Sequence, residues 1–308
     1  MRDDSETGRR KKALRIDCVI LNYNDADTVL GLVDEIRGYG AFHKIVIVDN
    51  ASTDDSWKKL QSISSEKIEL LRAEKNGGYG AGNNIGVRYC VEKDGADYVL
   101  IANPDVKFSE SCVCALAGVL SRHPELAVSA ALMEDQTFGE TKNGWKLHGF
   151  WGELFAMGPI CRRVFRKCLN YPETYFEGKK AVYVDAGHGS MLMVDGKKFL
   201  EVGGYDEGIF LYQEEAVLGT RLKRQGYKSV LLLNHTYRHE HSVSISKSFQ
   251  GQRERQKLRN VSVLYYLKRY HGIGKWQEWM AKLWFEVILL EIRAAKLLVS
   301  LDVRKLPL

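Results

Sequence analysis

Residues 44–50, KIVIVDN, form a short apolar run that ends abruptly in two polar side chains, Asp49 and Asn50. Residues 16–22, IDCVILN, show the same pattern upstream. Neither run alternates between apolar and polar residues, which is typical of parallel strands that are buried on both faces of a sheet. Because parallel neighbours need long crossover connections, these two runs predict helices between the strands.

The same unit recurs along the first half of the chain. Further strands are predicted at 68–73, 97–103 and 126–133, with helices ending near residue 37 and spanning about 80–92 and 109–121. This order predicts an α/β domain with a parallel sheet that is covered by helices on both faces. Residues 134–180 break the rhythm and predict a loop-rich insertion, and helical periodicity dominates from about residue 246 onward.

Composition is that of an ordinary globular protein: 308 residues, 45% of them hydrophobic, can bury one large core or two smaller ones. The first twelve residues, MRDDSETGRRKK, predict a flexible tail. The six cysteines form no C-x-x-C pair and no apolar leader is present, so we expect a reduced, cytoplasmic protein. The most apolar stretch, 284–301, carries four charges, so it can lie on a membrane but is not expected to cross one.

The net charge of +6 is unevenly distributed over two basic clusters. They consist of Arg162, Arg163, Arg166 and Lys167, and of Arg253, Arg255, Lys257 and Arg259. Such clusters suit a phosphate-rich partner or an anionic membrane surface, and they also occur as solvated helix faces. The sequence leaves both interpretations open.

Small polar and acidic side chains follow the predicted strands, at 22–24 (NYN), 49–50 (DN) and 103–105 (NPD). In open α/β sheets, ligands bind beyond the carboxyl ends of the strands, so these groups are expected at one ligand-binding edge. Helix capping is an alternative that fits Ser52 and Asp55, but it does not require a carboxylate at both Asp49 and Asp105.

Residues 76–86, NGGYGAGNNIG, match neither the dinucleotide fingerprint nor the phosphate loop. Their glycines could let the backbone pass close to a ligand, with Asn83 or Asn84 offering amides, or they could form a turn that caps a helix. A carboxylate such as Asp105 is a suitable ligand for Mg²⁺ or Mn²⁺.

Two further motifs lie in the second half of the chain. Glu214 and Glu215 open a predicted helix, where a carboxylate beside another acid can serve as a general base. His239 and His241 are two residues apart and would share one face of a strand, so either could join Asp105 at a metal.

These motifs occur in one order, and that order resembles the family 2 glycosyltransferases of the GT-A fold, in particular their bacterial rhamnosyltransferase-like branch. The resemblance covers about residues 15–245 through the blocks VILNYND, IVIVDNASTDDS, NGGYGAGNNIG, YVLIANPDV, GGYDEGIFLYQEE and HEHSVS. It implies a tail at 1–12, a GT-A catalytic domain at 13–245 and a helical C-terminal extension at 246–308. The catalytic domain would divide into a donor half, about 13–133, and an acceptor half, about 134–245.

The resemblance also implies roles for individual residues. Asp49 would read the pyrimidine base, and the other donor-side residues would be Asn22, Tyr23, Asn76, Gly77, Asn84 and Asn103. The NPD triplet stands where relatives carry D-x-D, so Asp105 and His239 would bind Mn²⁺ or Mg²⁺, with Pro104 fixing the turn that aims Asp105. Glu215 would be the catalytic base beside Glu214, and the acceptor side would be shaped by Gly203, Gly204 and Asp206.

The implied reaction is an inverting transfer from a UDP- or dTDP-sugar, rhamnose included, to a polysaccharide or lipid-linked glycan, with no nucleic-acid partner. Glu215 replaces the usual Asp, and Val217 and Ser242 replace an acid and a glycine. A non-catalytic nucleotide-sugar or glycan-binding protein of the same fold is the alternative, and Val217 is its best support. A sugar nucleotidyltransferase would need a glycine-rich loop with a basic residue after the first strand, which this chain lacks.

The last sixty or so residues fall outside the family blocks. Their apolar positions at helical spacing are Trp276, Trp279, Met280, Leu283, Trp284, Val287, Ile288 and Leu298, with Lys275, Lys282 and Glu286 on another face. Interfacial helices use such tryptophans and lysines, so the pattern predicts contact with the inner face of a membrane. Packing on the catalytic domain and formation of a homodimer are the alternatives.

Overall fold

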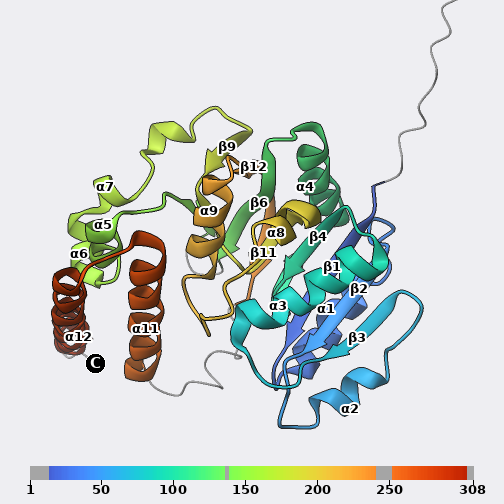
Figure 1. The fold of residues 1–308 in the computed structure, drawn as a ribbon, viewed down its shortest axis with the longest axis horizontal. Helices are drawn as coiled ribbons and strands as arrows, with labels where there is room; N and C mark the ends of the chain where they lie inside the picture. The colour runs from blue at the N-terminus through green and yellow to red at the C-terminus, as the bar shows by residue number, and fades with distance from the viewer. Residues whose placement is uncertain (1–13, 136–138, 241–251, 304–308) are drawn as a thin grey trace, which may run out of the picture.

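A computed structural model describes residues 14–135, 139–240 and 252–303. A mixed sheet runs through the molecule, and the C-terminal helices lie together at one end of it (Figure 1). The first half of the chain contains β1 (Ile16–Asn22), α1 (Ala26–Ile36), β2 (Lys44–Asp49), α2 (Ser56–Gln61), β3 (Ile68–Arg72), α3 (Gly78–Tyr89), β4 (Tyr98–Ala102), β5 (Val106–Phe108), α4 (Glu110–Arg122) and β6 (Leu126–Asp135). A π-helical turn, Cys90–Asp94, extends α3. The predicted strands and helices are confirmed, whereas α2 and β5 were not predicted.

The second half of the chain completes the sheet. Its elements are β7 (Gly139–Thr141), β8 (Gly144–Trp145), α5 (Phe150–Phe155), α6 (Pro159–Val164), α7 (Arg166–Leu169), the 3₁₀ turn Glu173–Tyr175, β9 (Ala181–Val184), β10 (Ala186–Gly187), β11 (Met191–Asp195), α8 (Gly196–Glu201), α9 (Glu214–Arg224), β12 (Lys228–His239), α11 (Gln252–His271) and α12 (Lys275–Val303). The expected loop-rich insertion at 134–180 therefore contains three short helices.

The strand order β3-β2-β1-β4-β11-β6-β12-β5 combines two kinds of pairing. The first four strands pair in parallel, as expected for a nucleotide-binding core. Strand β11 then inserts antiparallel between β4 and β6, so the predicted parallel core is confirmed and the sheet as a whole is mixed. The antiparallel insertion brings a turn from the second half of the chain next to the end of β4.

The parallel strands lack alternation because both of their faces are covered. Cys18 and Ile20 of β1 pack into one core with α1 and α4. Val19, between them, packs into a second core with α3, α8 and α9. Successive strand side chains point to opposite faces, so an apolar residue is needed at every position.

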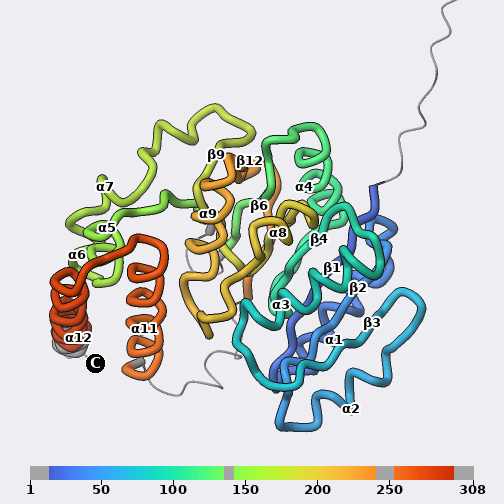
Figure 2. Tube along the Cα trace, viewed as in Figure 1, coloured from blue at the N-terminus to red at the C-terminus, as the bar shows by residue number. Residues whose placement is uncertain are grey.

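The C-terminal helices pack against the α/β domain. Helix α11 contacts α9, where Tyr266 Oη lies 2.8 Å from Thr220 Oγ1 and Arg221 Nε donates to Tyr270 Oη at 2.9 Å. Helix α12 packs beside α5 and α6, and Trp284 Nε1 donates to Leu154 O at 3.0 Å. Figure 2 shows α11 and α12 next to the α5–α7 segment. Helices α11 and α12 thus share apolar cores with the preceding α/β part of the chain.

Candidate active site

The carboxyl ends of β1 and β2 hold a closed hydrogen-bond cluster. Asn22 Nδ2 donates to Asp49 Oδ1 at 2.8 Å and to Ser52 Oγ at 3.0 Å, and Ser52 Oγ donates to Asp49 Oδ1 at 2.5 Å. The backbone N–H of Ser52 donates to the second oxygen, Oδ2, and Arg72 Nε lies 3.7 Å from it. Asp49 is fully buried. Three donors therefore fix its carboxylate, and Tyr23 lies partly exposed beside the cluster.

The capping alternative for this segment is wrong for both of its residues. Helix α2 begins after Asp55, whose side chain makes no capping hydrogen bond. Ser52 instead bonds Asp49 and accepts from the Asn24 backbone N–H at 3.0 Å. The polar residues after β2 therefore hold the strand ends of β1 and β2 together.

Four non-glycine residues of the described segments have positive φ: Asn24, Ala51, Tyr212 and Gln213, at 53°, 58°, 73° and 74°. The first two follow β1 and β2, and the other two directly precede α9. Such conformations are costly for residues with a Cβ and concentrate at functional sites. The strained backbone marks the two places from which the predicted donor and catalytic residues project.

The glycines of 76–86 serve helix packing. A Cβ on Gly78 would lie 2.1 Å from Phe210 O, and one on Gly82 would lie 2.3 Å from Leu21 Cδ1. Helix α3 can therefore approach both the end of β1 and the 203–213 loop. Its first turn is tied to the strand ends through Asn76, whose Oδ1 accepts from Asn50 Nδ2 at 3.0 Å and from Gly78 N, next to Gly77.

Asn84 lies farther along α3 and bridges it to the 203–213 loop. Its Nδ2 donates to Tyr205 O and Glu207 Oε1, and its Oδ1 accepts from Tyr205 N, at 3.0, 3.1 and 3.0 Å. A Cβ on Gly204 would lie 2.6 Å from Asn84 Oδ1. The structure thus shows Asn84 as an anchor for this loop, and its predicted contact with nucleotide remains a prediction.

Asp105 and His239 come together although they are far apart in the sequence. Strand β5 pairs with the end of β12 in a register that sets Val106 opposite His239. Asp105 Oδ1 lies 3.3 Å from His239 Nε2, and each side chain is 9% exposed. Neighbouring ligands of an octahedral ion with bonds of about 2.1 Å lie roughly 3 Å apart. The two side chains therefore fit as adjacent ligands, whereas His241 and Ser242 lie outside the described residues.

A turn between β10 and β11, residues 188–190 (HGS), links this pair to the acidic helix start. The His188 and His239 rings lie 5.6 Å apart. Asn103 N donates to Ser190 O at 2.8 Å, which brings the turn against the NPD triplet. Gly189 N donates to Glu215 Oε1 at 2.9 Å. Sequence analysis missed this turn, and its small residues between two apolar runs were the available signal.

Glu214 and Glu215 open α9 in different environments. Glu214 is only 4% exposed, and its Oε1 has no hydrogen-bond partner among the described residues. Burial and the neighbouring Glu215 raise the pKa of Glu214 to about 8. A carboxyl that already holds a proton at neutral pH cannot accept another, whereas Glu215 is partly exposed and receives the Gly189 N–H. The geometry favours Glu215 as the proton acceptor.

Val217 lies on the next turn of α9 and is fully buried in an apolar cluster with Ile209 and Tyr266. An acid at this position would have to be desolvated against α11. The departure from the family pattern therefore has a packing explanation.

Asp206, predicted on the acceptor side, binds α11 and α9. Its carboxylate accepts from Tyr270 Oη at 2.6 Å and from Gly208 N at 2.9 Å, and Arg221 Nη2 lies 3.4 Å away. Burial alone would raise the pKa of Asp206, but these donors lower it. Gly203 and Gly204 precede it with φ of 83° and 58°, and their carbonyls accept from Arg221. The 203–213 loop is thereby fixed to α11 and α9.

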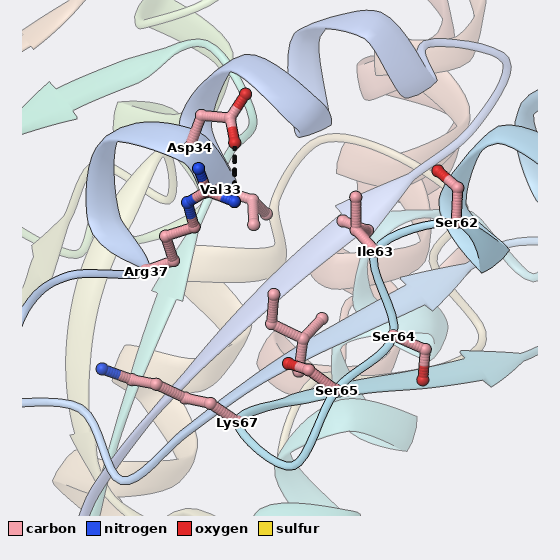
Figure 3. A pocket seen from close by; sticks show the side chains of 9 residues that line it. Val33, Asp34, Arg37, Ser62, Ile63, Ser64, Ser65 and Lys67 are labelled. Carbon is pink, nitrogen blue, oxygen red and sulfur yellow. Dashed lines mark ion pairs between the residues drawn. The ribbon is translucent and has the colours of Figure 1, made fainter.

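Two other features lie at the opposite, amino-terminal edge of the parallel strands. A hollow of about 410 Å³ lies between the end of α1 and the α2–β3 connection, and includes the Asp34–Arg37 ion pair at 3.5 Å (Figure 3). None of the predicted site residues lines it. We therefore assign the hollow no part in the site.

The second feature is the group of Asp17, His43 and Asp94, whose ligand atoms lie within 4.8 Å of one another, as in a metal site. Burial and Asp94 raise the pKa of Asp17 to about 7. Arg15 Nη2 and Lys44 Nζ lie 3.0 and 3.6 Å from Asp94 Oδ1. Because these cations already balance the carboxylates, the group is better explained as an ion-pair network.

The sheet with its buried polar strand ends, the carboxylate–imidazole pair and the acidic helix start agree with the resemblance to family 2 glycosyltransferases of the GT-A fold. The pattern of glycosyl transferase family 2 matches residues 17–195, more than half of the chain. The chain belongs to this family, as the resemblance implied.

Curated relatives agree with this assignment. The low-salt glycan biosynthesis hexosyltransferase Agl10 of Haloferax volcanii is 25% identical over 67% of this chain and 61% of its own length. The N-acetylglucosaminyl-diphospho-decaprenol L-rhamnosyltransferase of Mycobacterium tuberculosis is 28% identical over 60% of this chain and 62% of its own. Rhamnosyltransferase WbbL of Escherichia coli is 24% identical over 75% and 87%. The match thus spans about three fifths of the first two relatives.

Solved structures confirm the fold. The mannosyltransferase PcManGT of Pyrobaculum calidifontis, in complex with GDP-Man and Mn²⁺, aligns with a TM-score of 0.57 at 13% identity over 96% of this chain and 76% of its own. GalNAc-T7, with UDP, GalNAc and Mn²⁺, aligns with a TM-score of 0.55 at 15% identity over 75% and 44%.

Proposed function

We propose that this chain is an inverting, divalent-metal-dependent glycosyltransferase that moves a sugar from a UDP- or dTDP-sugar to a glycan acceptor, with rhamnose as the expected sugar. One observation carries the proposal: the turn at 188–190 lies between the Asp105–His239 pair and Glu215. The candidate metal ligands and the candidate proton acceptor thereby contact the same short turn. The relatives named as rhamnosyltransferases support the choice of sugar.

In the proposed reaction, the acceptor hydroxyl oxygen attacks the anomeric carbon of the donor sugar. The bond from that carbon to the diphosphate oxygen breaks, and its electron pair leaves with the nucleoside diphosphate. Glu215 takes the hydroxyl proton, while Glu214 stays protonated beside it. A single displacement from the opposite face inverts the anomeric centre.

Asp105 and His239 would hold a Mn²⁺ or Mg²⁺ ion, with remaining positions filled by substrate oxygens or water. When bound, the ion would offset the charge of the departing diphosphate. On the donor side, the fixed carboxylate of Asp49 is suited to accept a hydrogen bond from a pyrimidine ring N–H, with Asn22 and Ser52 holding its orientation.

Calorimetric titration with UDP and with dTDP, each with and without Mn²⁺, tests the proposal. We expect one of the two nucleotides to bind, and to bind at least tenfold more weakly without the ion. If neither nucleotide binds, the donor assignment is overturned and the alternative, a glycan-binding protein without catalytic activity, is favoured.

Helix α12 supports peripheral contact with a membrane. The apolar residues of α12 fall into two groups. Ile288 of the predicted face and its neighbour Phe285 are buried against α5 and α11, and the side chain of Leu298 lies outside the described residues. The other group is exposed at spacings of three and four, and comprises Trp276, Trp279, Leu283, Val287 and Leu290, at 62%, 59%, 50%, 37% and 59% exposure. Tryptophan-bearing stripes of this kind bury themselves in the headgroup region.

Among the residues described, no helix is long and apolar enough to span a bilayer. Sedimentation with phosphatidylglycerol vesicles tests the surface contact, and we expect Trp276→Ser with Trp279→Ser to reduce the bound fraction severalfold. If the wild-type chain does not sediment and is dimeric by light scattering, the stripe is a dimer interface.

A further inference from the structure

Three arginines near the start of α9 have no acidic partner. No carboxylate of the described segments lies within 4.0 Å of the guanidinium of Arg162, Arg255 or Arg259, although nearby cations do form ion pairs. Arg162 belongs to α6, and the other two belong to α11. Arg255 and Arg259 are partly buried. Unbalanced guanidinium groups in a partly desolvated region are costly, so their neighbourhood requires explanation.

Helix geometry places Arg255 and Arg259 over the approach to α9. Ser262 Oγ donates to Leu211 O at 2.6 Å, and Tyr266 contacts Thr220 one turn later. The later residue of α11 contacts the later residue of the 211–220 segment, so α11 runs in the same general direction as α9 (Figure 1). Positions 255, 259, 262 and 266 share one helix face. The two arginines therefore project next to the strained backbone of Tyr212 and Gln213.

The electrostatics confirm this placement. Burial, followed by the positive charge of Arg162, lowers the pKa of the Arg259 guanidinium. The groups that act on it in the opposite sense are Tyr212, Glu153 and Glu215. Arg259 therefore lies close enough to Glu153 and Glu215 for their charges to act on it, on the side of the helical extension.

We propose that Arg162, Arg255 and Arg259 form an anion subsite that binds a phosphoryl group of the acceptor and so brings the acceptor hydroxyl to Glu215. This inference rests on the proposed function, because it assigns the acceptor of the same reaction to a class: a glycan carried on a lipid phosphate or diphosphate. Guanidinium groups bind phosphate oxygens through paired hydrogen bonds, and an anion between Arg162 and Arg259 relieves their mutual repulsion.

The donor also contains a diphosphate, so the test must separate the two sources of phosphate. Geranyl diphosphate and geraniol are matched probes for the acceptor side, and UDP and dTDP with Mn²⁺ are probes for the donor side. We expect the wild-type chain to bind geranyl diphosphate but not geraniol. Arg259→Gln should weaken binding of geranyl diphosphate at least tenfold and leave nucleotide affinity unchanged.

Arg162→Gln provides a second variant that cannot fail through misfolding, because Arg162 is solvent-exposed. The matched control is Arg163→Gln, an exposed arginine beside it. It should change geranyl diphosphate affinity less than twofold, and Arg259→Lys should restore part of the lost affinity.

Each contrary result has a definite meaning. If nucleotide affinity falls in the arginine variants as much as geranyl diphosphate affinity, the subsite serves the donor and the acceptor assignment is overturned. If the wild-type chain does not bind geranyl diphosphate, or the variants bind it equally well, the anion subsite does not exist. If the wild-type chain binds geranyl diphosphate but no nucleotide, the subsite stands and the proposed donor reaction fails.

Discussion

The proposed donor side and the proposed acceptor side of the candidate active site differ in how their polar groups are satisfied. At the ends of β1 and β2, the buried Asp49 carboxylate receives hydrogen bonds from Asn22 and Ser52. At the start of α9, Glu214 Oε1 has no partner among the described residues, and Arg259 has no carboxylate within ion-pair distance. The first region is organised before substrate arrives, whereas the second holds a protonated carboxyl group and a guanidinium group for which a substrate would supply partners.

This difference predicts that substitutions on the acceptor side change catalysis and pH behaviour more than they change the fold. Substitutions on the donor side should instead change the folded state and nucleotide binding together.

The largest effect is expected for Glu215→Gln. The amide cannot accept the acceptor proton, so kcat should fall by roughly 10²–10⁴, while nucleotide affinity stays within about twofold. Single-turnover transfer assays together with titration of the nucleotide would measure both quantities. A variant that retains near wild-type turnover would show that Glu215 is not the base.

The next effect concerns pH and Glu214. Its pKa is raised to about 8, so the folded chain holds a proton that the unfolded chain releases near pH 4.5. The free energy of unfolding should therefore fall as pH rises from about 5 to 8, by up to a few kcal/mol. In Glu214→Gln this fall should disappear, so the variant gains stability relative to wild type with rising pH.

Urea unfolding at several pH values between 5 and 8.5 would measure this dependence. The control is Glu177→Gln, an exposed acid that should leave the profile unchanged. Parallel profiles for wild type and Glu214→Gln would contradict a protonated, buried Glu214.

A smaller effect is expected for Asp105→Ala. Removing one of two adjacent ligands should reduce the Mn²⁺-dependent gain in nucleotide affinity by about 10- to 100-fold, because His239 alone holds the ion weakly. Asp34→Ala at the opposite edge of the sheet is the matched control. Equal Mn²⁺ dependence in wild type and Asp105→Ala would remove Asp105 from the metal site.

The smallest effect is expected for Ser52→Ala on the donor side. Loss of one donor to the buried Asp49 should lower the free energy of unfolding by about 1–2 kcal/mol and weaken nucleotide binding severalfold. Ser64→Ala, at an exposed position, should change neither. If Ser52→Ala has the same free energy of unfolding as the wild type but binds nucleotide more weakly, Ser52 contacts the ligand directly.

The parallel strands could be predicted because burial on both faces leaves a continuous apolar run at each of them. The antiparallel β11 could not, since strand order depends on how distant segments meet. For the same reason the residues alone left His239 and His241 as alternative partners of Asp105, only the family resemblance selected His239, and the turn at 188–190 was missed.

The glycines of α3 illustrate a second limit. The number of glycines in this segment indicated that its backbone could pass close to another group. The sequence does not show whether that group is a ligand or another part of the protein. The partners are Phe210 for Gly78 and Leu21 for Gly82, and both are remote in sequence from the glycine that they contact. The reason for a valine at position 217 could not be predicted from the sequence either, because Val217 packs against Tyr266 of the distant helix α11.

The register that sets Val106 opposite His239 also bears on when activity can first arise during synthesis. The ribosome releases β1 to β4 early, and these strands with their helices can begin to fold as a unit. Asp105 gains its imidazole partner only after β12 has emerged and docked against β5. A nascent chain could therefore not complete the proposed metal ligand pair, and the proposed sugar transfer would wait until the second half of the protein has folded.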